Sequence, residues 1–159
     1  IGYSYSKSLS LPGERIGYLV IPDEVSDAED VIAAANVATR ILGYVNAPSL
    51  MQRVILRCLD AKVNLEAYDR NRNLLYNGLK DLGFECIKPQ GAFYLFVKSP
   101  EADEKKFCEN CKKYNILVVP GTSFACPGYV RISYCVSYEQ IERSLPAFAK
   151  VAADYGLTK

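Results

Sequence analysis

The hydrophobic pattern changes at Gly83, and this change limits the fold more than any other feature of the sequence. Before it, apolar residues recur at helical spacing in three segments, 26–42, 49–59 and 62–82. After it, short apolar runs typical of strands lie at 84–87, 92–97, 116–119 and 129–135, and helical patterns lie at 101–113 and 137–151. Helices followed by intermixed short strands and helices predict an α/β chain that ends in an α+β domain.

Two capping boxes mark the expected starts of helices. Ser26 precedes Glu29 by three residues, and Ser137 precedes Gln140 by three. In such a pair the serine hydroxyl bonds an unpaired backbone amide of the first turn. We therefore expect helices to begin directly after Ser26 and after Ser137.

The chain opens with two segments that alternate in polarity, residues 1–7 and 15–21, joined by a Pro-Gly dipeptide. This pattern predicts two strands connected by a loop. The one plausible domain boundary follows them, at residues 22–26.

Composition excludes several classes of function. None of the 159 residues is a histidine, which removes Ser-His and Cys-His nucleophile pairs and histidine-ligated zinc. The chain has 19 basic and 18 acidic residues, so no broad positive field favours nucleic acid or an anionic membrane as a partner. No apolar run approaches the length of a membrane span, and no signal peptide is recognisable.

The six cysteines lack the dense spacing of a disulfide-rich secreted domain, which favours reduced thiols and a cytoplasmic location. Cys108 and Cys111 have CxxC spacing, but no second pair at ligand spacing accompanies them, so we predict no metal site. The chain begins at Ile1, and we expect it to be a segment of a longer polypeptide.

The densest functional signal lies in residues 4–18. Lys7 closes the first expected strand, with Ser4 three residues before it and Arg15 eight residues after it. Lysine forms Schiff bases, while serine hydroxyls and a guanidinium bind phosphate, so the group could place an amine nucleophile beside a phosphate site. The alternative is a solvated lysine on an edge strand and an arginine in a surface ion pair.

This segment resembles the pyridoxal-phosphate lysine segment of the fold-type-I aminotransferases of class I and II. Both the Ser-x-x-Lys and the Lys-x7-Arg spacings of that family are present. The resemblance implies that Lys7 is the catalytic Schiff-base lysine. It also implies that Ser4, Lys7 and Arg15 bind pyridoxal 5'-phosphate.

Later stretches agree with the same family in order and spacing, at 89–94, 119–124 and 129–134. By that resemblance Gly91 lies at the mouth of the substrate pocket, where a glycine allows close backbone approach. Arg131 would bind the substrate α-carboxylate as a planar bidentate donor. The alternative for Arg131 is an ordinary strand arginine paired with a nearby acid.

The resemblance implies three parts: 1–25, a remnant of the large cofactor domain with the Schiff-base lysine; 26–82, an interdomain helical region; and 83–159, a C-terminal small α/β domain. In the family, the residues that contact the cofactor ring precede the lysine, and only six residues do so here. We therefore expect the C-terminal part of an aminotransferase, inactive alone and homodimeric in its full-length form.

The implied reaction transfers an amino group between an amino acid and a 2-oxo acid, with no nucleic-acid or membrane partner. A carbon-sulfur β-lyase or a decarboxylase of the same fold would share Lys7 and Arg131, and stays open as an alternative. A non-catalytic interaction module that only inherited the fold is the other alternative.

Overall fold

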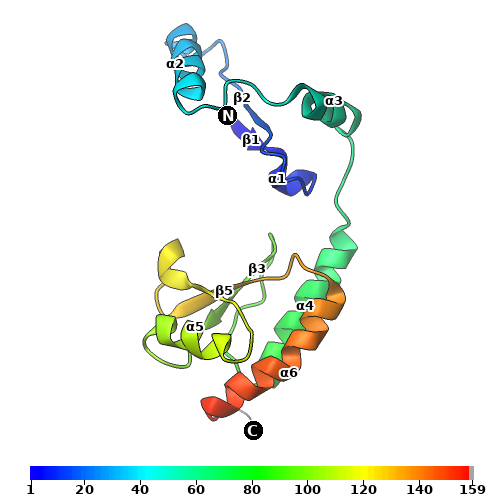
Figure 1. The fold of residues 1–159 in the computed structure, drawn as a ribbon, viewed down its shortest axis with the longest axis vertical. Coiled ribbons are helices and arrows are strands. Elements are labelled where there is room, and N and C mark those ends of the chain that lie inside the picture. Colours follow the sequence, from blue (N-terminus) through cyan, green and yellow to red (C-terminus); the bar gives the residue numbers. More distant parts are fainter. Residues whose placement is uncertain (158–159) are drawn as a thin grey trace. The chain divides into compact units, whose positions relative to one another are not determined.

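The computed structural model describes residues 1–157, and the chain divides into two compact units, Ile1–Val63 and Asn64–Lys159. Figure 1 shows the elements in chain order. Within residues 1–157, no helix has the combination of length and apolar character needed to cross a membrane. The three-part division predicted from the sequence stays a prediction, because compactness alone does not identify the parts of a larger enzyme.

The first unit begins with a two-stranded antiparallel sheet. Strand β1, Gly2–Ser4, pairs with β2, Gly17–Leu19, and the one-turn helix α1, Tyr5–Ser8, follows β1 directly. The two predicted strands are confirmed, but Lys7 lies on α1 and not at a strand end as predicted. The chain turns there because the hydroxyl of the N-cap residue of α1 accepts a hydrogen bond from a backbone amide two residues later, at 3.2 Å.

Two further helices belong to this unit, α2 at Ala28–Ile41 and α3 at Ser49–Arg57, and both lie in segments predicted from periodicity. The capping box at Ser26 is wrong. Asp27 occupies the N-cap of α2, and no side chain bonds a backbone amide there. Glu29 instead lies in the first turn, where its charge faces the positive end of the helix dipole.

The second unit is an α+β domain, which confirms the fold class predicted from the change of pattern. Its three-stranded antiparallel sheet has the order β3-β5-β4, so β5 is central. The elements are, in chain order, α4 Leu65–Asp81, β3 Tyr94–Lys98, α5 Glu104–Lys112, β4 Val119–Pro120, the 3-10 helix η1 Gly121–Phe124, β5 Tyr129–Ser133 and α6 Tyr138–Asp154.

Of two local features predicted for this unit, a capping box is confirmed in part and a hairpin is largely absent from the described residues. The second capping box is confirmed in part, since the Ser137 hydroxyl accepts a hydrogen bond from the Gln140 amide at 3.2 Å and opens α6. The predicted hairpin between 84–87 and 92–97 is reduced to one isolated bridge, from Cys86 to Val97. Residues 84–87 therefore do not form a full strand.

One face of the sheet and helices α4, α5 and α6 build a single hydrophobic core. Helices α4 and α6 lie side by side (Figure 1), and Gly78 permits the close approach: a Cβ there would lie 2.5 Å from Cδ2 of Leu145. The buried Asn71 amide donates to the carbonyls of Tyr134 and Val136, at 3.1 and 2.7 Å. These bonds attach α4 to the segment that follows the central strand.

Candidate active site

The residues predicted to bind the cofactor lie on backbone segments at the closed end of the β1-β2 hairpin. Ser4 is the last paired residue of β1, and the Tyr5 amide then donates to the Ile16 carbonyl at 3.1 Å. Lys7 lies on the helical turn after Ser4, and Arg15 directly precedes Ile16. The hairpin therefore places the backbone of Ser4 beside that of residues 16 and 17, with Lys7 and Arg15 next along the chain on either side.

Backbone packing fixes this end of the hairpin. A Cβ at Gly17 would lie 2.3 Å from the carbonyl oxygen of Tyr3, so no larger residue fits. Arg15 has a positive φ of 51°, and its Nη1 donates to the Pro12 carbonyl at 2.7 Å. Arg15 is exposed and forms no ion pair with a carboxylate of residues 1–157, so its other N–H donors are not used by an acid of this chain.

Serine hydroxyls surround the same turn. The Ser4 hydroxyl donates to the Ser6 hydroxyl at 2.9 Å. The Ser8 hydroxyl is buried and has no hydrogen-bond partner within the described residues. A buried hydroxyl without a partner is destabilising by about 1–3 kcal/mol, which a bound acceptor would relieve.

Arg131 lies on the central strand β5, opposite Phe96 of β3 and Val119 of β4. Its guanidinium carbon is 4.2 Å from the centre of the Tyr94 ring and 3.8 Å from the centre of the Phe124 ring. Such cation-π contacts favour a fixed guanidinium plane. In the part of the chain that the structure describes, no carboxylate forms an ion pair with Arg131. The alternative role, an arginine paired with a nearby acid, therefore has no acidic partner within these residues.

Gly91 lies in the loop that leads into β3. A Cβ at this position would meet no atom within 4 Å, so packing within the chain does not require glycine. Two hydrogen bonds from Tyr134 hold this loop. Its hydroxyl donates to the Ala92 carbonyl and its backbone amide donates to the Phe93 carbonyl, both at 3.0 Å. The backbone at Gly91 is therefore anchored yet open to a ligand.

The buried carboxylate of Glu104 holds the loop that carries Phe124. It accepts hydrogen bonds from the Thr122 hydroxyl and from the Gly128 amide, the latter at 3.2 Å. These bonds lower the pKa of Glu104, with the Thr122 contact as the main cause. The carboxylate therefore stays charged although it lies at 6% exposure.

The CxxC pair lies on α5, and both thiols are buried in the core of the second unit. Burial raises the pKa of Cys111 to about 12 and also raises the pKa of Cys108. Among residues 1–157 no group of three side chains suited to a metal ion is found. These thiols are packing residues, and their protonated form is strongly favoured.

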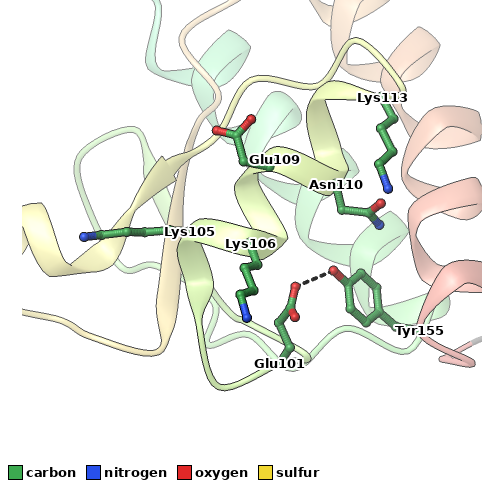
Figure 2. A pocket seen from close by; sticks show the side chains of 7 residues that line it. All are labelled: Glu101, Lys105, Lys106, Glu109, Asn110, Lys113 and Tyr155. Atoms are coloured by element: carbon green, nitrogen blue, oxygen red, sulfur yellow. Dashed lines mark hydrogen bonds between the residues drawn. The ribbon is translucent and has the colours of Figure 1, made fainter.

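A groove beside α5 is lined by none of the predicted site residues. Figure 2 shows its Glu101 carboxylate beside Lys106, accepting a hydrogen bond from the Tyr155 hydroxyl. The O···O distance of this bond is 2.7 Å, and Lys105 and Lys113 also line the groove. The pKa of Tyr155 is raised, mainly by burial of the phenol and to a smaller extent by its hydrogen bond to Glu101. The charged residues of both signs mark it as a polar surface groove.

Comparison with known proteins decides the family. The family model of aminotransferase class I and II matches residues 1–148. The chain belongs to this family. An amino transferase crystal structure from Eubacterium rectale is similar, with a TM-score of 0.86 and 55% identity over 97% of this chain and 39% of that one.

Curated relatives of this aminotransferase-family chain are similar over comparable lengths. The aspartate/prephenate aminotransferase of Thermus thermophilus is 35% identical over 150 residues, which are 92% of this chain and 39% of that protein. The aromatic-amino-acid aminotransferase 2 of Thermococcus litoralis is 32% identical over 154 residues, which are 92% of this chain and 39% of that protein. The chain thus spans about two fifths of the length of these relatives.

The family predicted from the sequence motifs is confirmed, but the surroundings of Arg131 were not predicted. Phe124 lies in the stretch 119–124 that resembles the family, and its aromatic character was the available signal. Its contact with Arg131 follows no spacing rule, because Phe124 ends η1 and an irregular loop leads from there to β5. The hydrogen bonds by which Glu104 holds the loop of Phe124 could not be predicted from the sequence, because Glu104 looks there like an ordinary acid at the start of a helix.

Proposed function

We propose that the full-length enzyme containing this chain is a pyridoxal-phosphate-dependent aminotransferase, which transfers an amino group between an amino acid and a 2-oxo acid. One observation supports the proposal: Lys7, Arg15 and several serines lie on the backbone segments at one end of the β1-β2 hairpin. The relatives add support, since their names specify aminotransferases for aspartate, prephenate or aromatic amino acids. The activity is assigned to the larger protein, because the chain covers only 39% of these first relatives or less.

The donor set at the hairpin end fits a phosphate ester beside an amine. Ser4 and Arg15 supply a hydroxyl and a guanidinium fork. The buried hydroxyl of Ser8, which has no hydrogen-bond partner among residues 1–157, is a further donor. When bound, the cofactor supplies an aldehyde that condenses with amines and a ring that withdraws electrons from the substrate α-carbon. We assign Ser4, Lys7 and Arg15 to this group.

Two residues of the chain would perform the chemical work. The Lys7 Nζ would hold the cofactor in the resting enzyme and would act as the general base toward the proton on the substrate α-carbon. Arg131 binds the substrate α-carboxylate through two parallel N–H···O bonds and so fixes which α-carbon bond is presented for reaction. Gly91 leaves open backbone for the substrate.

The proposal also covers the oligomeric state of the full-length enzyme, its location and the activity of the isolated chain. Large apolar side chains of the first unit are exposed, for instance Ile41 at 78% and Leu42 at 66%, which fits surfaces that a larger homodimeric enzyme covers. All six cysteines are free thiols, which fits a cytoplasmic protein. We expect the isolated chain to bind the cofactor weakly and to lack transamination activity.

Reductive trapping tests the proposal directly. Borohydride treatment of the full-length enzyme loaded with pyridoxal phosphate should attach the cofactor permanently to Lys7, as read by peptide mass spectrometry. The matched control is Lys62, which lacks the serine and arginine surroundings. An adduct on Lys62 or on any other lysine would contradict the assignment.

Product analysis of the same enzyme distinguishes the reaction type. Transfer of the amino group to an added 2-oxo acid supports the aminotransferase. Release of ammonia and a 2-oxo acid from a β-substituted amino acid, without such transfer, would instead show a β-lyase.

A further inference from the structure

A chain of contacts connects the start of α5 to Arg131, and its first member is Glu104. Both carboxylate oxygens of Glu104 bind neutral donors, one the Thr122 hydroxyl and the other the Gly128 amide. No ion pair to Glu104 exists within residues 1–157. The buried negative charge is therefore used to hold the two ends of the segment 122–128, and it does not neutralise Arg131.

The segment that Glu104 holds is a closed turn. The Cys126 amide donates to the Gly121 carbonyl at 3.0 Å, and Ala125 has a positive φ of 54°. A Cβ at Gly121 would lie 2.1 Å from the Cys126 carbonyl oxygen and 2.6 Å from the Tyr129 carbonyl oxygen. The turn is thus packed directly against the start of β5, and its residues have little freedom to move independently.

Phe124 extends from this turn over the guanidinium of Arg131. Phe124 is 40% exposed as a residue, and its ring makes an edge-on contact with Phe96, with ring centres 6.3 Å apart. Because Phe124 is this exposed, we infer that its place over Arg131 depends largely on the backbone of η1. Tyr94 covers the guanidinium independently, from β3.

We propose that Glu104 is a positioning residue for Arg131, acting through Thr122 and the turn that carries Phe124. Two rings restrict the guanidinium plane before the ligand arrives, so less side-chain entropy is lost when a carboxylate binds. The consequence for substrate rests on the proposed function. The coupling between Glu104 and the guanidinium does not, and it can be measured without substrate.

The coupling is tested by NMR on the 159-residue chain. Ring currents of Phe124 and Tyr94 should shift the Arg131 side-chain protons upfield. Glu104→Ala and, as a smaller change, Thr122→Val should each move these signals toward the positions found in Phe124→Ala.

Two further variants make the NMR test specific. Glu104→Gln should keep the wild-type shifts, because its amide oxygen can accept from Gly128 and its amide nitrogen can donate to the Thr122 hydroxyl. The matched control is Glu109→Ala, which removes an exposed acid from the same helix. Unchanged Arg131 signals in both Glu104→Ala and Thr122→Val, or an equal change in Glu109→Ala, overturn the proposal.

The consequence for substrate is tested by kinetics of the full-length enzyme. Glu104→Ala should lower kcat/KM for the amino acid roughly 5- to 30-fold while leaving cofactor affinity unchanged, and Glu104→Gln should recover most of it. Equal losses in both variants contradict positioning through hydrogen bonds. If Arg131→Ala has no effect on kcat/KM, the proposed function fails, whereas the NMR result still decides the coupling.

Discussion

The two units of the chain hold their candidate functional side chains in different ways. The second unit places Arg131 on the central strand of a sheet whose opposite face belongs to a core of 17 buried residues. In the first unit, Lys7 and Arg15 are placed by the closure of a short hairpin. Only two hydrophobic residues of that unit, Ile16 and Ile55, are buried in the described structure.

This difference shows which part of the candidate site has support of its own. Burial of apolar surface supplies most of the free energy of folding, and the second unit contains nearly all of it. The first unit relies on backbone hydrogen bonds, each of which contributes only about 0.5–1.5 kcal/mol net. The proposed carboxylate site is therefore expected to persist in the isolated chain, while the proposed phosphate site is expected to depend on surroundings that cover the first unit.

Thiol labelling should reveal the largest difference between the units. Cys111 lies in the core of the second unit with a pKa of about 12, whereas Cys58 is only partly buried in the first. At pH 8 we expect Cys111 to react with a maleimide at least ~1,000-fold more slowly than Cys58, because little thiolate forms and the core must open. Timed labelling with peptide mass spectrometry measures both rates, and similar rates would show that the second unit opens as readily as the first.

Substitution of Arg131 and of Arg15 should show that the two arginines bind different ligands. Arg131→Ala in the full-length enzyme should reduce kcat/KM by about thirty-fold to several-thousand-fold, because a substrate carboxylate loses a charged bidentate partner. Cofactor absorbance should stay intact. Arg15→Ala should show the reverse pattern, with weaker cofactor binding and a substrate defect that excess cofactor partly corrects.

Steady-state kinetics with cofactor titration measures both arginine variants. Arg131→Lys serves as the intermediate case, because an ammonium lacks the planar fork and should restore only part of the activity. Loss of cofactor in Arg131→Ala together with loss of substrate binding alone in Arg15→Ala would mean that the two sites are assigned the wrong way round.

A matched pair of isoleucines tests the difference in packing. Ile141 on α6 is 3% exposed, and Ile41 on α2 is 78% exposed. Ile141→Ala should lower the free energy of unfolding of the isolated chain by about 2–5 kcal/mol, whereas Ile41→Ala should change it by less than about 0.5 kcal/mol. Urea unfolding followed by circular dichroism gives both values, and an equal cost would reveal a core in the first unit that the structure does not contain.

The sequence predicted the elements whose residues follow a regular period. The long helices α4 and α6 and the strand with Arg131 were predicted because apolar side chains recur every three to four or every two residues there. Lys7 was misplaced because a single serine hydroxyl ends β1 and starts a helical turn, a choice that alternation of polarity does not reveal.

The part of the candidate site that could not be predicted depends on contacts between distant residues. Glu104 and Thr122 are 18 positions apart, and the turn between Thr122 and Arg131 follows no period. The family resemblance supplied Lys7, Arg15 and Arg131 as candidates, but it carried no information about which rings or acids orient them. Such contacts require the tertiary structure.

The smallest effect is expected at the two predicted capping boxes, one in each unit. The Ser137 hydroxyl bonds the Gln140 amide in the second unit, whereas Ser26 lies outside the N-cap of α2 in the first. Ser137→Ala should lower the free energy of unfolding by roughly 1 kcal/mol, because it leaves a backbone amide of α6 without its partner. Ser26→Ala is the control and should change it by less than about 0.5 kcal/mol. Thermal and urea unfolding of both variants give the two values. A loss at Ser26 as large as that at Ser137 would show that the box predicted from the sequence does form at α2 in solution, contrary to the structure.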